Sequence, residues 1–484
     1  MNESSPNLTV ECSANVNKTM QDADFAVVAK WIIPVVPENT VYQNHCLVVK
    51  DEKILDIIRF SDLEQRYNVK NVIDLKEMNS DTSSSISSTS EYILAPGFIN
   101  MHTHNAMSLL RGYADDVSLH DWLTKFIWPA EAQHVGEEFV KVGTELACLE
   151  MIKTGTTCCN DMYYYPEVSA QVIEQFGMRA TLAAPIIKFP TVYAQSEQEY
   201  IEKGIQLIEK YKDHSKIKIS LGPHAVYTIT DEAYLQVKEL SEKYGVKIHT
   251  HLHETCHEVS EEVKVSGKKP IERLRDLGIL SSSLIAAHMT QVTKEDLDLA
   301  AKSGINVVHC PESNLKLGVK GVSPVHKLLK QGVNVAIGTD SAASNDDLDM
   351  LGELRTAAYI DKLSANTHSL EGGEPVTPSY KILSMATING AKALGIDDKV
   401  GSLQIGKFAD FIAVKVSSHP VYDPISHLVY VGTNHVTDVW VAGKQLLRNS
   451  RLTTVNENQL KSRVLEFSQK IHASRPKTSL TVIS

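Results

Sequence analysis

The sequence predicts an α/β protein: a (β/α)8 TIM barrel joined to a small composite β-sandwich built from both chain ends. Between about residues 94 and 344, eight apolar runs alternate with stretches that can hold a helix, as in βαβ units around a parallel sheet. Nearly every run ends in polar residues, as expected where active sites form at the carboxyl ends of barrel strands. A doubly wound open sheet is the alternative, but no Gly-rich phosphate loop follows the first run.

The predicted barrel elements follow one another in a regular order. Two of the intervening segments, EEFVKVGTELACLEMIKTG and DEAYLQVKELSEKYG, have the apolar period of amphipathic helices. Eight such units in roughly 250 residues match the usual length of this barrel. The predicted strands are ILAPGFINMHTH, TTCCNDMYY, RATLAAPII, IKISLGPHAVY, KIHTHLHET, LIAAHMT, INVVHCPESN and VNVAIGTDSAAS.

The remaining segments define four predicted regions. Residues 1–23 are polar and are expected to form a disordered arm without a secretory signal. Short β-type runs at 24–93 are expected to form a small antiparallel sheet, which segments at 400–450 complete as the β-sandwich. The barrel is expected over 94–399 and a helix with a polar tail over 451–484, whereas 81–90 is a Ser-rich insertion of unassigned role.

Composition narrows the class of partner. The formal net charge of −11 argues against a nucleic-acid backbone or an anionic membrane, because both favour basic surfaces. No apolar run approaches the roughly 20 residues that cross a bilayer. The seven cysteines are odd in number and include no CxxC pair, which is typical of a reducing cytosol. We therefore expect a soluble cytoplasmic enzyme with a small-molecule substrate.

Histidines and one aspartate at the strand ends predict a metal site. His102 and His104 lie two residues apart where the first run ends, so both rings can face one cation. Asp340 follows the last run. In the fifth run His249, His251 and His253 alternate, and periodicity alone does not choose between them, although the position of His251 between strand and loop favours it. Three imidazoles and a carboxylate suit zinc, and also ferrous iron or manganese.

Three residues near this set could move protons. A metal lowers the pKa of a bound water toward neutrality, and the resulting hydroxide needs partners that accept and deliver protons. Asp340 is a candidate acceptor, Glu254 a candidate donor, and His288 a candidate to orient the hydroxide. The alternatives are that Asp340 caps a helix and that Glu254 is an ordinary solvated loop carboxylate.

These residues resemble the metal-dependent amidohydrolase superfamily, in the branch of methylthioadenosine and S-adenosylhomocysteine deaminases and triazine hydrolases. The resemblance covers roughly residues 25 to 450. It implies one divalent metal, expected to be zinc, bound by His102, His104, His251 and Asp340, with Glu254, His288 and Asp340 catalytic and with Trp122, Glu131 and His224 holding the nucleoside. The matching stretches are PGFINMHTHNAMSLLRGYADD, LHDWLTKFIWPAE, GPHAVYT, HLHET, AAHMT, HCPESNLKLG, GTDSAASN and GKFADFIAV.

The reaction that this resemblance implies is hydrolytic deamination of an adenine nucleoside at C6. Relatives that bind the homocysteine tail carry arginines after the third strand, whereas this chain offers only Lys188 there, beside Phe189 and Val192. We therefore expect 5′-methylthioadenosine as the substrate, with S-adenosylhomocysteine and adenosine as further candidates. Alternatives are a triazine hydrolase, a deaminase of another purine, and a metal-free structural relative. A homo-oligomer, either a dimer or a tetramer, is expected.

Overall fold

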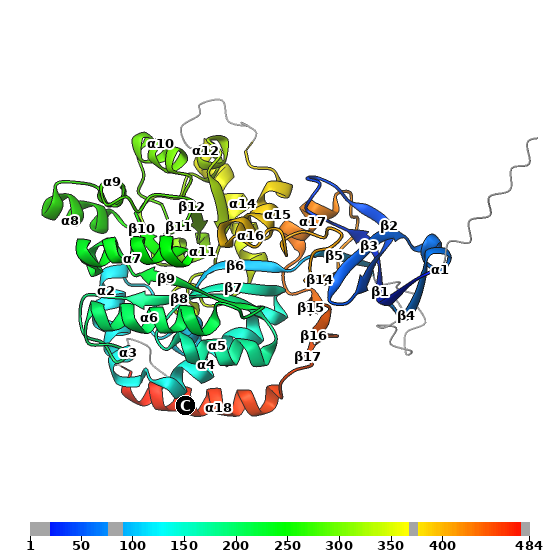
Figure 1. Ribbon diagram of the computed structural model, residues 1–484, viewed down its shortest axis with the longest axis horizontal. Coiled ribbons are helices and arrows are strands. Elements are labelled where there is room, and N and C mark those ends of the chain that lie inside the picture. The colour runs from blue at the N-terminus through cyan, green and yellow to red at the C-terminus, as the bar shows by residue number, and fades with distance from the viewer. Residues whose placement is uncertain (1–19, 76–90, 367–375, 476–484) are drawn as a thin grey trace, which may run out of the picture.

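The computed structural model describes residues 20–75, 91–366 and 376–475. Its larger part is an eight-stranded parallel sheet whose strands are neighbours in chain order, with helices around the outside (Figure 1). Within the described residues no helix is long and apolar enough to cross a membrane. The barrel strands are β6 (Phe98–Thr103), β7 (Thr156–Met162), β8 (Arg179–Ile186), β9 (Ile217–Pro223), β10 (Ile248–Leu252), β11 (Leu284–His288), β12 (Asn306–His309) and β13 (Asn334–Ile337).

The first and last barrel strands meet at a seam held by polar contacts. The backbone N–H of Asp340 donates to the carbonyl of His102 at 2.9 Å. Asn100 donates to the hydroxyl of Thr339 at 2.8 Å and accepts from the Thr339 backbone N–H at 3.0 Å. A Cβ on Gly338 would lie 2.5 Å from the backbone nitrogen of His102, so only glycine allows this approach. The seam confirms the predicted barrel and joins two segments that carry site residues.

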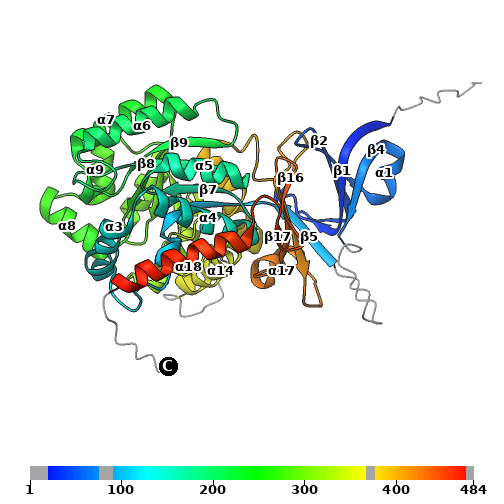
Figure 2. The same cartoon turned by 90° about the horizontal axis from the view of Figure 1, so that it is seen from below.

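Helices cover the outside of the barrel. The two amphipathic segments recognised in the sequence form α4 and α7, and α18 lies along α4 (Figure 2). The helices are α1 (Leu63–Arg66), α2 (Leu119–Asp121), α3 (Trp128–His134), α4 (Glu137–Lys153), α5 (Pro166–Phe176), α6 (Glu197–Tyr211), α7 (Asp231–Tyr244), α8 (Cys256–Ser266), α9 (Pro270–Asp276), α10 (Lys294–Ser303), α11 (Pro311–Lys316), α12 (Val325–Lys330), α13 (Ala342–Asn345), α14 (Met350–Asn366), α15 (Ser379–Met385), α16 (Ile388–Leu394), α17 (Pro424–Val431) and α18 (Glu457–Ser474), with a π-helical turn at Trp122–Ile127.

A second sheet of nine strands lies beside the barrel and combines both chain ends, as predicted (Figure 1). Strands β14 and β5 pair antiparallel and so join the C-terminal part of the sheet to its N-terminal part. The strands are β1 (Gln21–Ile32), β2 (Tyr42–Lys50), β3 (Lys53–Arg59), β4 (Tyr67–Asp74), β5 (Glu91–Pro96), β14 (Phe411–Val416), β15 (Val436–Val441), β16 (Lys444–Arg448) and β17 (Arg451–Leu452).

Three details of the sequence interpretation require correction, and two segments that it covered lie outside the described residues. The run ILAPGFINMHTH is not one barrel strand, because it divides at Gly97 into β5 of the small sheet and β6 of the barrel. The small sheet is mixed, since β1 pairs in parallel with both β4 and β5. Strand β1 begins at Gln21, inside the region expected to be a disordered arm. Residues 1–19 and the Ser-rich insertion at 81–90 lie outside the described residues.

Candidate active site

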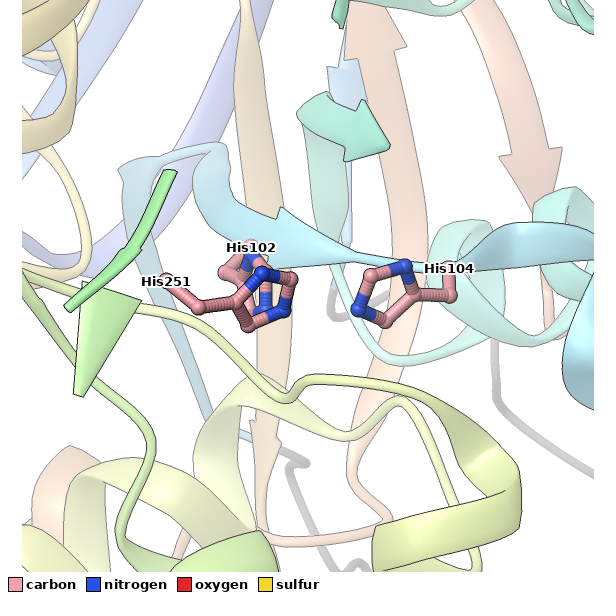
Figure 3. A group of neighbouring side chains, drawn as sticks. All are labelled: His102, His104 and His251. Carbon is pink, nitrogen blue, oxygen red and sulfur yellow. The ribbon is translucent and has the colours of Figure 1, made fainter. Parts of the chain in front are cut away.

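Three histidines predicted to bind a metal lie together at the carboxyl end of the barrel. Their ligand atoms lie within 4.8 Å of one another. Figure 3 shows the ring of His251, from β10, beside those of His102 and His104 from β6 and the residue that follows it. His104 donates from Nδ1 to the carbonyl of Met162, and His251 donates from Nδ1 to the carbonyl of His224 at 2.8 Å. With Nδ1 bonded to a carbonyl, each ring has Nε2 as the atom that can bind a cation.

Asp340 completes the cluster after β13. Its Oδ1 lies 3.3 Å from Nε2 of His104 and 3.5 Å from Nε2 of His102. Burial opposes the charge of Asp340, but its hydrogen bond with His104 prevails and lowers the pKa of Asp340 below its ordinary value. Burial and neighbouring histidines lower the pKa of both His102 and His251, so these rings are neutral. Burial also opposes a charge on His104, but its hydrogen bond with Asp340 prevails and raises the pKa of His104 to about 9. Because metal ligands must be neutral imidazoles and ionised carboxylates, His104 would release a proton on binding a cation.

The other two histidines of strand five lie in different places. His249 is deeper in the barrel, and its Nε2 lies 3.0 Å from Nδ1 of His102. His253 follows the end of β10 with φ of +54°, so the alternation of the strand no longer governs its direction. Its ring contacts the carbonyl of Gln291 and the backbone N–H of Ile271 instead. The structure therefore brings only His251 of the three into the ligand cluster.

Glu254 and His288 face each other beside the cluster. Nε2 of His288 lies 3.7 Å from Oε1 of Glu254. Burial, with a smaller contribution from the charge of Asp340, raises the pKa of Glu254 to about 8. At neutral pH Glu254 therefore carries a proton that it can donate. Its backbone N–H donates to Oε2 of Glu258 at 2.6 Å, a buried contact that sequence reasoning missed.

Two of these residues have a backbone conformation that side chains rarely adopt. The φ angles of His288 and Asp340 are +79° and +64°. Residues other than glycine are uncommon in this left-handed conformation, although Asp and His adopt it more often than most, and it is found mainly where the surrounding structure holds it. At His288 the positive φ turns the chain at the end of β11, and the buried ring lies against those of His102 and His251.

A cavity opens onto the cluster. Among the described residues that line it, the only Asp and Glu side chains are Glu131, Glu254 and Asp340, and no Lys or Arg is present. Most of the other side chains are apolar or aromatic, as in pockets for small organic ligands. The lining residues are His104, Met107, Leu119, Trp122, Leu123, Ile127, Trp128, Glu131, Met162, Tyr163, Tyr164, Pro185, Ile187, Phe189, His224, Tyr227, His251, Glu254, Leu317, Asp340, Ser341 and Ser344.

The three residues expected to hold a nucleoside all line this cavity. Glu131 accepts a hydrogen bond from the Tyr163 hydroxyl at 2.7 Å, and burial raises the pKa of Glu131 to about 7. The indole N–H of Trp122 is buried and has no hydrogen-bond partner among the described residues. His224 follows β9, and its Nδ1 lies 3.1 Å from the hydroxyl of Thr228. Sequence reasoning missed Tyr163, whose signal was its place at the end of a predicted strand.

Of the two apolar side chains named beside Lys188, Phe189 and Val192, only one lines the cavity. Phe189 lines the cavity and contacts the ring of Trp128, with centroids 6.3 Å apart. Val192 is not a lining residue, and its carbonyl accepts from Tyr165 at 2.8 Å. Lys188 does not line the cavity either. His309 is buried in the barrel outside the lining, and His257 lies outside it beside His120.

The donor set fits a divalent cation. Nε2 of His102 is buried and has no hydrogen-bond partner among the described residues, so this nitrogen is available to bind a metal. Three imidazoles and one carboxylate are ligands that suit zinc and similar ions. Fold and site together are those of a barrel hydrolase with a buried His/Asp cluster that could hold a metal ion.

Comparisons with known proteins agree with this class. The model of the amidohydrolase family matches residues 93–446, and the chain belongs to this family of metal-dependent enzymes. The chain is 42% identical over 456 residues to a 5-methylthioadenosine/S-adenosylhomocysteine deaminase of Teredinibacter turnerae, covering 93% of this chain and 98% of that protein. It is 36% identical to a 5′-deoxyadenosine deaminase of Methanosarcina acetivorans, covering 90% and 96% respectively.

Solved structures show the same fold. A crystal structure of an adenosine deaminase from Xanthomonas campestris with bound zinc has a TM-score of 0.88 and 38% identity, and covers 94% of this chain and 100% of that chain. A triazine hydrolase from Arthrobacter aurescens has a TM-score of 0.81 at 20% identity, covering 92% and 99%. The second likeness concerns the fold alone.

Proposed function

We propose that this enzyme deaminates adenine nucleosides by hydrolysis, converting the C6 amino group to a carbonyl and releasing ammonia. The observation that carries the proposal is the position of two buried carboxyl groups at one ligand cluster, with Asp340 against His102 and His104 and with Glu254 facing His288. Burial raises the pKa of Glu254, whereas the hydrogen bond with His104 lowers that of Asp340. One group can give a proton to the ring while the other takes a proton from water. The names of relatives that are 36% to 42% identical over most of the chain support an adenine nucleoside as substrate.

We assign the metal to His102, His104, His251 and Asp340, and we propose zinc because the structure of the Xanthomonas relative holds it. A cation held there would lower the pKa of a water molecule and so make it a nucleophile at neutral pH. Asp340 is positioned to take one proton of this water as its oxygen bonds to C6. Glu254 gives its proton to N1 of the ring, so that C6 becomes tetrahedral and carries both oxygen and the amino group.

The second half of the reaction returns both carboxyl groups to their first states. Asp340 passes its proton to the amino group, and the C6–N bond breaks with its electron pair going to nitrogen, which leaves as ammonia. The hydroxyl proton at C6 returns to Glu254, and the carbonyl of the inosine-type product forms. Atoms and charges balance, with one water consumed and one ammonia released. A ring nitrogen of His288 lies within 4.8 Å of ligand atoms of His102 and Asp340, so His288 can donate a hydrogen bond to the attacking oxygen.

The remaining cavity residues fit a nucleoside with a small 5′ group. Glu131 can accept hydrogen bonds from ribose hydroxyls, and the unpaired indole N–H of Trp122 can donate to an oxygen of the sugar. Because no Lys or Arg lies among the described lining residues, the carboxylate of a homocysteine tail would have no partner there. We therefore propose 5′-methylthioadenosine as the preferred substrate, with its sulfur against Phe189 and Trp128.

Ammonia release from a substrate panel tests this proposal. The zinc-loaded enzyme is assayed with methylthioadenosine, 5′-deoxyadenosine, adenosine, S-adenosylhomocysteine and guanine. An unpaired buried polar group costs about 1–3 kcal/mol, so kcat/KM for S-adenosylhomocysteine should be lower than for methylthioadenosine by about 5- to 150-fold. Phe189→Arg supplies a cation and should narrow this ratio. A preference for S-adenosylhomocysteine would refute the substrate choice, and full activity of Asp340→Asn would refute the mechanism.

A further inference from the structure

The short helix α11 (Pro311–Lys316) points two neighbouring polar side chains at the catalytic residues. Ser313 and Asn314 belong to the stretch HCPESNLKLG and have no part in the reaction described above. Both side chains are buried. The Ser313 hydroxyl donates to Oδ2 of Asp340 at 2.7 Å, and the amide Nδ2 of Asn314 donates to Nδ1 of His288 at 3.1 Å.

The contact with Asn314 determines where His288 carries its proton. An amide nitrogen has hydrogens and no lone pair to offer, so Nδ1 of His288 must accept. A neutral imidazole that accepts at Nδ1 carries its only hydrogen at Nε2. His104 and His251 have the opposite arrangement, because backbone carbonyls accept from their Nδ1 atoms. When neutral, these two rings therefore present a lone pair at Nε2, whereas neutral His288 presents an N–H.

Distance alone does not separate His288 from the metal ligands. Nitrogen and oxygen atoms of His102, His288 and Asp340 form a second group that is compact enough to hold a metal ion. The ring of His288 stacks on that of His251, with centroids 5.5 Å apart. Nε2 of His288 is buried and has no hydrogen-bond partner among the described residues. A protonated Nε2 cannot bind a cation, but it can donate to an oxygen that enters this space.

We propose that Asn314 is a positioning residue that keeps His288 as a hydrogen-bond donor to the attacking oxygen and prevents it from becoming a metal ligand. The inference rests on the metal site of the proposed function. The inference also assigns different roles to His288 and Asp340, because a His288 that already carries the Nε2 hydrogen cannot take the proton of the water. That proton goes to Asp340, whose Oδ2 already accepts from Ser313.

Asn314→Asp tests this assignment with almost no change of shape. A carboxylate can only accept, so it draws the hydrogen of His288 to Nδ1 and frees the lone pair of Nε2. In enzyme loaded with cobalt(II), His288 should then join the ion, and the visible absorption should lose intensity as the coordination number increases. We expect kcat to fall by about 10²-fold or more, with KM changed less than about threefold, because the substrate contacts are intact.

Two further variants separate this role from a structural one. In a His288→Gln background, Asn314→Asp should leave the cobalt spectrum unchanged, because the ring that would join the ion is absent. Asn314→Ala, which removes the donor without adding an acceptor, should also lower kcat at unchanged KM, and it serves if the Asp variant does not fold.

The outcomes distinguish this inference from the proposed function. If the wild-type enzyme binds cobalt and releases ammonia but Asn314→Asp has the same spectrum and kcat, the role of Asn314 is refuted and the proposed function stands. Wild-type kcat in Asn314→Ala would refute it equally. If the wild-type chain binds no cobalt, the metal site itself is refuted, and the assignment of Asn314 falls with it.

Discussion

Removal of one hydroxyl, by Tyr163→Phe, should change how substrate affinity depends on pH. Burial raises the pKa of Glu131 to about 7, and the hydrogen bond from Tyr163 acts in the opposite direction by stabilising the carboxylate. Without that hydroxyl the pKa of Glu131 rises further. Loss of a hydrogen bond to a charged group removes about 1.5–3 kcal/mol of stabilisation, which corresponds to an acid dissociation constant that is lower by about 10- to 100-fold.

The effect on KM follows from the fraction of Glu131 that is ionised. At pH 7.5 a group with a pKa of about 7 is roughly three-quarters ionised. In Tyr163→Phe the ionised fraction should be between roughly a quarter and a few per cent, which raises KM for an adenine nucleoside by about 3- to 25-fold. The catalytic carboxyls are untouched, so kcat should change less than about twofold.

The assay is KM as a function of pH for three variants. In the wild type, KM should fall as pH rises through about 7, because the carboxylate that accepts from ribose is formed there. In Tyr163→Phe the same fall should occur at higher pH. Glu131→Gln should give a high KM without this inflection, and adding Tyr163→Phe to it should change nothing. Superimposable curves for the wild type and Tyr163→Phe would refute the role of the hydrogen bond.

Two further predictions concern the metal and the barrel seam. Removal of the metal by a chelator should abolish ammonia release, and added zinc should restore it. The thermal unfolding midpoint should also fall, since an ion bound only by the folded state stabilises that state. A fully active chelated enzyme would contradict the metal site. Gly338→Ala places a methyl group 2.5 Å from the backbone nitrogen of His102. We therefore expect the free energy of unfolding to fall by about 1–3 kcal/mol and the zinc content to fall as well. Thermal unfolding and metal analysis measure the two effects. Unchanged zinc content would show that the seam does not hold His102 in place.

The start of the barrel region shows why a pattern of residues identifies strands better than it assigns them to sheets. The run ILAPGFINMHTH is apolar throughout, and its composition says nothing about where one sheet ends. The division at Gly97 comes from partners far away in the chain. Asp410 provides the carbonyl that accepts from the Gly97 N–H, and a Cβ on Gly97 would lie 2.2 Å from the side chain of Thr157. Such contacts are absent from any local pattern.

Contacts between distant segments also determine which histidine joins the site and which ring nitrogens carry hydrogen. His249, His251 and His253 are equivalent by alternation, yet the turn at His253 and the depth of His249 leave one of them in the cluster. The tautomers of His251 and His288 depend on which group of another segment meets Nδ1. For His251 this group is a backbone carbonyl, and for His288 it is an amide N–H.

Local patterns in the sequence suffice to predict the barrel, the composite second sheet and the residue types that suit a metal-dependent hydrolase, because strand periodicity and strand-end chemistry are local properties. The three-dimensional arrangement was needed to choose the strand-five histidine that joins His102 and His104 in the ligand cluster, and to find the hydrogen bonds of Tyr163 with Glu131 and of Asn314 with His288. It also showed a cavity with no Lys or Arg among its described lining residues. These properties depend on burial and on hydrogen bonds between segments that are distant in the chain, which no local pattern contains.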